Sequence, residues 1–364
     1  MRILHTEASV GWGGQEIRIL DESLGMIARG HEVTVACVPG SRIHEEAIKR
    51  GVPVVTLAIG RKRLQGVCAM RRWLKANPTD VVNTHSSTDS WLTALARLML
   101  KRKPGIVRTR HISAPVTDNA MTRWLYTKAT AHIATTGESL RLMLAQENGF
   151  PLENITSVPT GIDPQKFAPM ADKRAVRAEL GLEADAYYVG IVATLRSWKG
   201  HQYLLEAFAQ AARPDWRLLI VGDGPQREAL QQRVAELGIQ DRTTFTGQRD
   251  NPERWLQVLD VFCLPSYANE GVPQAILQAM LTCLPIVTTP VGAIAEAVEN
   301  GVSALIVPPR NSAALRDGLL RLAGDPALAT RLGAAARLRA QEKFSREAML
   351  DRMEVVFRKA CPAP

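Results

Sequence analysis

The sequence predicts an α/β protein of two Rossmann-like domains, each with a doubly wound parallel sheet, that face each other across a cleft. Apolar, β-branched runs alternate with helical patterns along all 364 residues. Strands that are buried on both faces and joined by helices are typical of parallel sheets. The runs number roughly a dozen, whereas one open sheet rarely exceeds about ten strands. Two domains with separate cores are therefore the simplest arrangement for a chain of this length.

The first domain is predicted over residues 1–163. Its strands are expected at Arg2–His5, Val33–Val38, Val54–Ile59, Asp80–Thr84, Ile106–Thr109 and His132–Thr135. Helical patterns separate them over residues 15–29, 64–76, 89–100, 119–130 and 137–147. In the segment Pro159–Pro164, turn residues follow a strand and precede polar, charged sequence, so we place the domain boundary there.

The second domain is predicted over residues 164–344. Its strands are expected at Tyr188–Ala193, Leu218–Val221, Thr243–Phe245, Val261–Leu264, Pro285–Thr288 and Ala304–Val307. The tail, residues 345–364, has the apolar spacing of an amphipathic helix, which we expect to pack back on the first domain. Ligands of open α/β sheets bind at the carboxyl ends of the strands, so the working site is expected in the cleft between the two sheets.

Composition excludes several classes of protein. The N-terminal segment has one basic residue followed by glycines, unlike a signal peptide. The uncharged run 271–295 is interrupted by prolines and glutamines, so we predict helix, turn and strand there and not a membrane span. The 5 cysteines are scattered and never spaced as CxxC, which suits reduced thiols in a cytoplasm. No paired His or Asp motif indicates a metal site, and we expect neither a metal nor a cofactor.

The net charge of +9 is concentrated in the first half of the chain. Residues 1–163 hold 21 Lys and Arg against 14 Asp and Glu, a net of +7, and the remainder holds 24 against 22, a net of +2. Basic clusters lie at Arg61-Lys62-Arg63, Arg71-Arg72 and Lys101-Arg102-Lys103. They are either a solvated surface or a site for an anionic partner, such as a phosphate-bearing acceptor or an acidic membrane surface. Nucleic acid is not expected, because no binding motif or interleaved aromatics accompany the charge.

Three features of the first domain are candidates for a site. Gly13 and Gly14 follow the first strand and open a helix, where backbone N–H groups can approach an anion; a plain tight turn explains them nearly as well. The segment lacks the GxGxxG dinucleotide fingerprint. His85 and His111 each end a strand, so both should lie at the edge of the sheet where ligands bind.

In the second domain, Arg196 and Lys199 lie in a loop at the carboxyl end of a strand. Two cations in this position can hold a diphosphate, although two solvated side chains are the simpler alternative. Glu270 is the only Asp, Glu, Lys or Arg between Asp260 and Glu296. It either caps the helix that follows it or accepts hydrogen bonds from neighbouring hydroxyls of a sugar. Together these residues predict a pocket for a diphosphate attached to a sugar.

The chain resembles the retaining glycosyltransferases of family 4, which have the GT-B fold, over nearly its whole length. The resemblance rests on Gly13-Gly14-Gln15-Glu16, Ile106-Val107-Arg108-Thr109-Arg110-His111, Lys199-Gly200, Gly222-Asp223-Gly224-Pro225 and the segment from Pro265-Ser266 through Glu270-Gly271 to Ala279-Met280. It implies an N-terminal acceptor-binding domain and a C-terminal domain that binds the nucleotide sugar.

The resemblance also implies roles for individual residues. Gly13 and Gly14 would contact the donor phosphate, His111 and Glu270 the donor sugar, and Lys199 with an arginine the diphosphate. His111, Lys199 and Glu270 are the expected catalytic residues. The remaining donor-site residues expected are Arg196, Gly247, Gly271, Val272 and Gln278, and the acceptor side is expected to include Glu16, His85 and Arg110.

Two positions depart from the family pattern. Gln278 stands where the family has a second acid that holds the ribose, and a glutamine can bind a ribose hydroxyl only without charge. Thr194 stands where the family usually has an arginine, and Arg196 can supply that charge instead.

The function implied by the resemblance is transfer of a hexose from a UDP- or GDP-linked sugar to a cell-envelope glycan such as a lipopolysaccharide, O-antigen or capsule precursor. A metal-independent front-face displacement would retain the anomeric configuration, with the leaving diphosphate accepting the proton. The enzyme would be cytoplasmic or peripheral at the inner face of the cytoplasmic membrane. The alternatives are a soluble transferase with a small-molecule acceptor and a non-catalytic protein that binds nucleotide sugars or polyanions.

Overall fold

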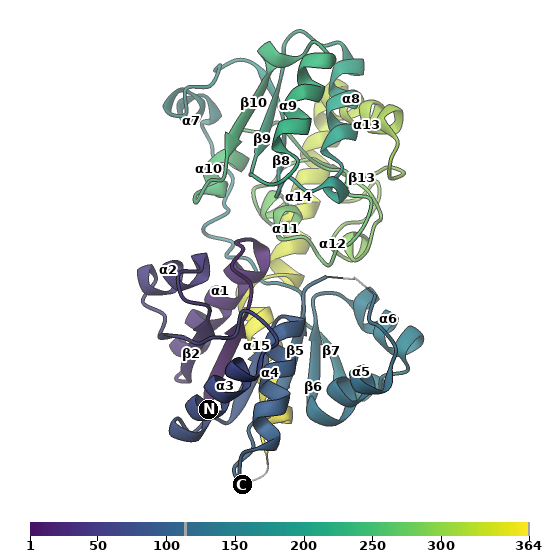
Figure 1. The fold of residues 1–364 in the computed structure, drawn as a ribbon. Helices are drawn as coiled ribbons and strands as arrows, with labels where there is room; N and C mark the ends of the chain where they lie inside the picture. The colour runs from purple at the N-terminus through teal and green to yellow at the C-terminus, as the bar shows by residue number, and fades with distance from the viewer. Residues whose placement is uncertain (113–114, 363–364) are drawn as a thin grey trace. The chain divides into compact units, whose positions relative to one another are not determined.

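The computed structural model describes residues 1–112 and 115–362, and the chain divides into two compact units (Figure 1). The first unit is Met1–Gly161 together with the C-terminal segment that begins at Arg346, and the second is Ile162–Ser345. Each unit is built around one parallel sheet, as the alternation of apolar strands and helices predicts.

The first unit contains a seven-stranded sheet in the order β3-β2-β1-β4-β5-β6-β7, and its paired strands are parallel. The strands are β1 (Arg2–Glu7), β2 (Glu32–Cys37), β3 (Val54–Thr56), β4 (Val81–Thr84), β5 (Gly105–Arg110), β6 (His132–Thr135) and β7 (Ile155–Ser157). The helices are α1 (Gly14–Ala28), α2 (Arg42–Lys49), α3 (Leu64–Ala76), α4 (Ser87–Leu98), α5 (Ala120–Trp124) with a π-helical turn at Leu125–Ala129, α6 (Glu138–Asn148) and a 3₁₀ turn at Leu152–Asn154.

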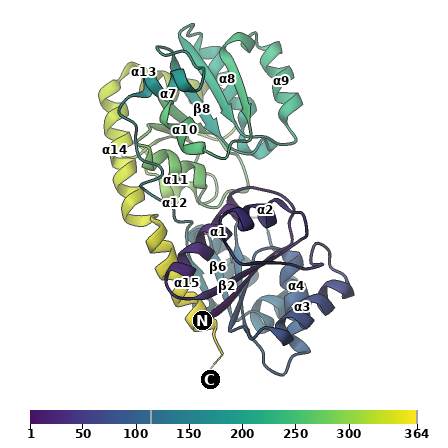
Figure 2. The ribbon, with the colours of Figure 1, turned by 90° about the vertical axis from the view of Figure 1, so that its left-hand side faces the viewer.

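The C-terminal helix α15 (Arg346–Ala360) belongs to the first unit, although it is the last element of the chain. Figure 2 shows it beside α1. Its apolar face is buried with residues from strands β1, β2, β4, β5 and β6; the helix contributes Met349, Leu350, Met353, Val356, Phe357 and Ala360. A Cβ on Gly105 would lie 1.9 Å from the carbonyl oxygen of Ala360, so the helix end and β5 approach too closely for any other residue at 105. Residues 363 and 364 of the predicted tail lie outside the described residues.

The second unit contains a six-stranded parallel sheet in the order β10-β9-β8-β11-β12-β13. The strands are β8 (Tyr187–Val192), β9 (Trp216–Val221), β10 (Thr243–Gly247), β11 (Val261–Leu264), β12 (Ile286–Thr288) and β13 (Leu305–Ile306). The helices are α7 (Lys173–Glu179), α8 (His201–Ala211), α9 (Arg227–Glu236), α10 (Pro252–Gln257), α11 (Gln274–Leu281), α12 (Ile294–Ala297), α13 (Ser312–Gly324) and α14 (Pro326–Lys343), with 3₁₀ turns at Ser197–Lys199 and Gln240–Arg242.

Several elements differ from the sequence-based prediction, among them the strand expected at Val54–Ile59, which ends at Thr56. The predicted helix 119–130 is two short pieces, α5 and the π-helical turn. The short strand β7 and helix α2 were not predicted, since each offers too few residues for a clear periodicity. The uncharged run 271–295 is a helix, a turn and a strand, as its prolines predict. Among the described residues, no helix combines the length and the apolar character that crossing a membrane requires.

Candidate functional site

Two loops at the carboxyl edge of the second sheet are locked together. The loop after β8 ends at Gly200, whose φ of +75° lies in the left-handed region that favours glycine. A Cβ at this position would lie 2.0 Å from the carbonyl oxygen of Pro265, in the loop after β11. The backbone N–H of Tyr267 donates to the carbonyl of Trp198 at 2.8 Å, which ties the two loops directly. The residues carried by these loops are therefore held at fixed positions.

The partner of the isolated carboxylate is Lys199. Its Nζ lies 2.7 Å from Oε1 and 3.0 Å from Oε2 of Glu270, so one ammonium binds both oxygens. The hydroxyl of Ser266 donates to the same Oε1 at 2.6 Å. Glu270 is 4% exposed, whereas the side chain of Lys199 is 17% exposed and keeps a path to solvent. Sequence spacing alone could not pair residues that lie 71 positions apart.

This pair joins the two groups that a sugar diphosphate requires. An ammonium donates to phosphate oxygens, and a carboxylate accepts from sugar hydroxyls. Without ligand, Lys199 and Glu270 neutralise each other, which makes the near burial of the carboxylate tolerable. A ligand that carries both anionic oxygens and hydroxyls could replace this contact with one for each partner.

Glycines elsewhere in the unit make room for this arrangement. Gly292 has φ of +58°, and a Cβ there would lie 2.0 Å from the carbonyl oxygen of Glu270. Gly222 has φ of +142°, and a Cβ there would lie 2.0 Å from the carbonyl oxygen of Ala193. These close approaches hold the loops after β8 and β11 against neighbouring backbone. Gly222, in the turn at 222–225, is therefore required by packing.

The other predicted donor-site residues of this unit lie on several different elements. Arg196 is exposed, and its guanidinium carbon lies 5.7 Å from the ring centre of Trp198. Gly271 and Val272 are buried at the end of the loop, and Gln278 is buried in α11. Gly247 ends β10 and forms an isolated bridge with Gly222. Helix α11 begins at Gln274, with Pro273 as its N-cap residue.

In the first unit the structure brings His85 and His111 into contact. Nδ1 of His85 lies 2.9 Å from Nε2 of His111. A third imidazole, that of His5, joins them, with its Nδ1 3.0 Å from Nε2 of His85. His5 was not among the residues predicted from the sequence, although a histidine within the apolar strand RILHTE is a signal that could have identified it.

Gly13 and Glu16 lie at the N-terminus of α1. Gly13 is the N-cap residue with extended backbone, and Gly14 is the first residue of the helix. Burial raises the pKa of Glu16, and hydrogen bonds from the backbone N–H groups of Glu16 and Gly13 and the side chain of Ser9 oppose that rise. The carboxylate of Glu16 is therefore directed to the start of its own helix.

Glu7, at the end of β1, is a second buried acid that was not predicted. Its Oε1 accepts from the backbone N–H of Ser9 at 2.7 Å, and its Oε2 accepts from the amide of Gln15. Burial, with a smaller contribution from the carboxylate of Asp89, raises the pKa of Glu7 to about 8.

Arg110 is bonded within the unit. Its Nη1 donates to the hydroxyl of Tyr126 at 2.9 Å, and burial lowers the pKa of its guanidinium. Nε of Arg108 donates to the same hydroxyl at 2.9 Å. The side chain of Arg110 therefore stabilises the fold around β5 in the ligand-free protein.

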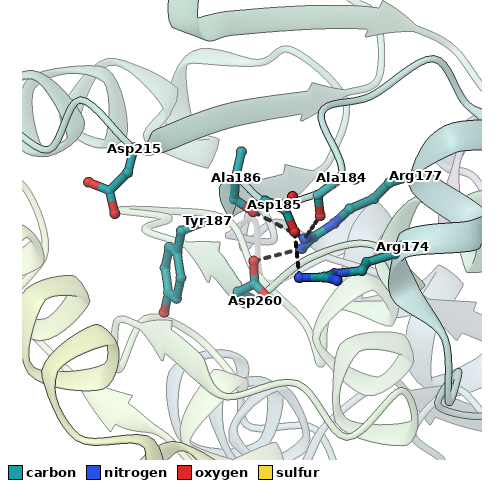
Figure 3. Close-up of a pocket in the computed structure, with 8 residues that line it drawn as sticks. All are labelled: Arg174, Arg177, Ala184, Asp185, Ala186, Tyr187, Asp215 and Asp260. Atoms are coloured by element: carbon teal, nitrogen blue, oxygen red, sulfur yellow. Dashed lines mark hydrogen bonds and ion pairs between the residues drawn. The ribbon is translucent and has the colours of Figure 1, made fainter.

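A cavity of about 340 Å³ lies at the opposite, amino edge of the second sheet (Figure 3). Its central charges bind one another. Arg177 donates to the carbonyls of Ala184 and Ala186, and its Nη2 lies 2.7 Å from Oδ2 of Asp260. Arg174 and Asp185 form an ion pair at 2.6 Å. This cavity contains none of the predicted site residues. Its Arg177 holds the backbone at Ala184 and Ala186 through hydrogen bonds to their carbonyls. Within residues 1–112 and 115–362, no group of three or more His, Cys, Asp or Glu side chains is placed to bind a metal ion.

Both parts of the chain match known families. Residues 12–166 match Glycosyltransferase Family 4, and residues 186–325 match Glycosyl transferases group 1. The chain is 30% identical over 280 residues to the 2-deoxystreptamine glucosyltransferase of Streptomyces kanamyceticus, a match that covers 71% of this chain and 70% of the relative.

Two further relatives are matched over a smaller share of their length. The chain is 29% identical over 234 residues to the lipopolysaccharide core biosynthesis mannosyltransferase LpsB of Rhizobium meliloti, which covers 62% of this chain and 64% of the relative. It is 33% identical over 234 residues to the D-inositol 3-phosphate glycosyltransferase of Nocardia farcinica, which covers 61% of this chain and 51% of the relative.

Solved structures have the same fold at lower sequence identity. Anabaena Alr3699/HepE in complex with UDP-glucose has a TM-score of 0.88 at 21% identity, covering 98% of this chain and 99% of that one. A glycosyltransferase from Rickettsia africae has a TM-score of 0.87 at 18% identity, covering 99% and 98%. With family matches in both units and these structural neighbours, the chain belongs to the family 4 glycosyltransferases, and its two parallel-sheet units have the GT-B fold.

Proposed function

We propose that the protein transfers a hexose from a UDP- or GDP-linked sugar to a glycan acceptor of the cell envelope, with retention of the anomeric configuration. The observation that carries this proposal is the contact of Lys199 with Glu270, which joins a donor for phosphate to an acceptor for sugar hydroxyls in one rigid pair of loops. The complexes of Anabaena HepE with UDP and UDP-glucose support a nucleotide sugar as the donor.

The proposed donor contacts follow the charges. Lys199 and Arg196 bind the diphosphate, and the charge that develops on this leaving group is stabilised by both cations. Glu270 and His111 bind hydroxyls of the sugar. Gln278 binds the ribose by a neutral hydrogen bond.

Further donor and acceptor contacts are proposed from the family pattern. Gly13 and Gly14 approach the phosphate through their backbone N–H groups, and Gly247, Gly271 and Val272 line the donor site. Glu16, His85 and Arg110 belong to the acceptor side, His85 through its contact with His111 and not by a direct hydrogen bond.

In the proposed reaction the bond from the anomeric carbon to the diphosphate breaks as the bond to the acceptor oxygen forms on the same face. The proton of the acceptor hydroxyl passes to the leaving diphosphate, so the protein supplies no nucleophile. We propose that no metal ion is required, because Lys199 and Arg196 supply the positive charge that the diphosphate needs.

The charge of the first half of the chain favours an anionic acceptor. Residues 1–163 carry +7 of the total +9. The clusters Arg61-Lys62-Arg63 and Lys101-Arg102-Lys103 are exposed, and Leu64, Leu98 and Met99 beside them are exposed as well. Apolar and basic side chains together suit the surface of a membrane that carries anionic lipids.

The two clusters lie at opposite ends of the packed helices α3 and α4. Lys62 donates to Ser87 at the start of α4, and Arg71 donates to the carbonyl of Met99 just past its end. The helix α3 is about 20 Å long from its 13 residues at about 1.5 Å each. One small ligand could not bridge the two clusters, whereas a long glycan or a membrane surface could contact both.

A soluble transferase with a small-molecule acceptor is the second candidate. It is favoured by the names of two relatives, a 2-deoxystreptamine glucosyltransferase and a D-inositol 3-phosphate glycosyltransferase. A third relative, LpsB, is named as a mannosyltransferase of lipopolysaccharide core biosynthesis.

The donor is tested with a panel of UDP-, GDP- and ADP-sugars in a thermal-shift assay, because a bound ligand raises the melting temperature by mass action. Release of nucleoside diphosphate is then measured with a lipid-linked glycan, with a small polyol and without an acceptor. Release that depends on the glycan supports the envelope acceptor, and release that depends on the polyol supports the second candidate. A protein that no nucleotide sugar stabilises is not the proposed transferase.

A further inference from the structure

Three imidazoles from neighbouring strands form a continuous hydrogen-bonded chain on one face of the first sheet. His5 lies in β1, His85 follows β4 and His111 follows β5, with ring contacts of 3.0 and 2.9 Å. His5 is level with Asn83 in β4, two residues before His85, and side chains two apart point to the same face. The same two-residue step separates His85 from His111 between β4 and β5. Sheet order and register therefore place the three rings on one diagonal.

Each ring is neutral, so each has one N–H and one lone pair. Burial lowers the pKa of His5 to about 3. Burial holds the pKa values of His85 and His111 well below the usual range, helped at His85 by the two neighbouring rings and at His111 by neighbouring arginines. A chain of neutral imidazoles has only two arrangements of its protons, because all N–H groups must point along it in the same direction.

The buried end of the chain faces a carboxylate. Nε2 of His5 lies 3.9 Å from Oε1 of Glu22, and the amide of Asn83 donates to the same oxygen at 3.3 Å. Oε2 of Glu22 lies 3.5 Å from Nε of Arg18. Burial raises the pKa of Glu22 above its usual value, and the charge of Arg18 with hydrogen bonds from Arg18 and Asn83 opposes that rise. The guanidinium of Arg18 stays protonated, so an ionised Glu22 compensates its charge in the interior. An ionised carboxylate can only accept hydrogen bonds.

We propose that Glu22 sets the direction of this chain, so that all three histidines carry their proton on Nε2 and Nδ1 of His111 is an acceptor for a hydroxyl of the ligand. His5 turns its Nε2–H towards Glu22, His85 donates from Nε2 to Nδ1 of His5, and His111 donates from Nε2 to Nδ1 of His85. His5 and His85 are thus positioning residues that fix the tautomer of His111. The assignment of the ligand as a sugar rests on the proposed function, whereas the assignment of the tautomer does not.

The proposal is tested by long-range ¹H–¹⁵N correlation spectra of ¹⁵N-histidine-labelled protein without ligand. The seven histidines are assigned by single substitutions. The expected result is the Nε2–H tautomer for His5, His85 and His111. A proton on Nδ1 of His111 in the wild-type protein overturns the proposal, whatever the donor panel gives.

Two variants of His85 separate positioning from packing. His85→Leu removes both hydrogen bonds, so His111 is expected to become a mixture of tautomers, and the donor KM should rise by roughly three- to tenfold, the worth of one hydrogen bond. His85→Gln offers His111 a carbonyl acceptor and His5 an amide donor, so it should restore part of the tautomer preference and part of the KM. His132→Leu is the matched control, because His132 is buried in β6 of the same sheet and its Nε2 lies 2.8 Å from the hydroxyl of Thr156, outside the chain of three rings.

The outcomes distinguish this inference from the proposed function. Nε2–H tautomers in a protein that binds no nucleotide sugar support the chain and contradict the transferase. Donor binding with an unchanged His111 tautomer in His85→Leu contradicts the chain and leaves the transferase standing.

Discussion

Replacing Glu270 with glutamine separates the two roles of the Lys199–Glu270 pair. The substitution keeps the shape of the side chain and leaves an oxygen for the Ser266 hydroxyl, but it removes the charge that Lys199 binds at 2.7 and 3.0 Å. It also removes a negative charge from the place where an anionic diphosphate is proposed to bind. Stability and transfer are therefore expected to fall, whereas affinity for the free nucleoside diphosphate is not.

The size of the stability loss follows from burial. Removing one partner of a fully buried ion pair costs about 3–5 kcal/mol. The Lys199 side chain is 17% exposed and can reach water, which lowers the expected cost to about 1.5–3 kcal/mol, the value of a hydrogen bond to a charged group. For a unit the size of Ile162–Ser345 this corresponds to a melting temperature lower by about 3–12 °C.

The effects on ligand are measured separately. Loss of a charged hydrogen bond to the sugar should lower kcat/KM by about 10- to 150-fold. Titration calorimetry with the free nucleoside diphosphate should give unchanged or tighter binding for Glu270→Gln and weaker binding for Lys199→Ala. The matched control is Glu183→Gln, whose carboxylate is 60% exposed and whose ion pair with Arg217 at 2.7 Å should contribute less than about 1 kcal/mol. Normal turnover in Glu270→Gln, or equal losses of diphosphate affinity in the Glu270 and Lys199 variants, would refute these roles.

Three other outcomes are expected. Gly200→Ala should lower stability by more than about 2 kcal/mol, because left-handed backbone strain adds to an overlap of the new Cβ with the Pro265 carbonyl. The control Gly181→Ala should cost only about 1–2 kcal/mol, because Gly181 has φ of +70° but a Cβ there meets no atom within 4 Å. Equal melting temperatures of the two variants would contradict this packing. Burial raises the pKa of Glu7 to about 8 in the folded protein, so the native state binds a proton that the unfolded state has lost, and stability should fall as pH rises from about 4.5 through 8. In denaturant titrations, Glu7→Gln should remove this dependence of stability on pH, and an unaltered dependence would show that Glu7 is not its source. The wild-type protein should sediment with anionic vesicles at low salt and be released at high salt, since screening acts over about 8 Å at physiological ionic strength. Gln substitutions at 61–63 and 101–103 should abolish this binding. A wild-type protein that stays in solution at every salt concentration has no membrane-binding surface of this kind.

The sequence by itself determined where most strands lie and what kind of protein this is. The strands His132–Thr135 and Val261–Leu264 were predicted with the bounds that the structure has, because continuous apolar runs between turn residues are a local property of the chain. The family was evident from the order of short motifs. The isolation of Glu270 within an uncharged run showed that this carboxylate needs a partner.

Only the tertiary structure decided which groups meet. Lys199 reaches Glu270 because the left-handed backbone of Gly200 and its contact with Pro265 join loops from two strands. His5 joins His85 and His111 because β1 lies beside β4, which is not its neighbour along the chain, and β4 lies beside β5. Hydrophobic periodicity acts over neighbouring residues and can be recognised in the sequence. The pairing of polar side chains depends on strand order, register and loop conformation, which are set by the packing of the whole unit.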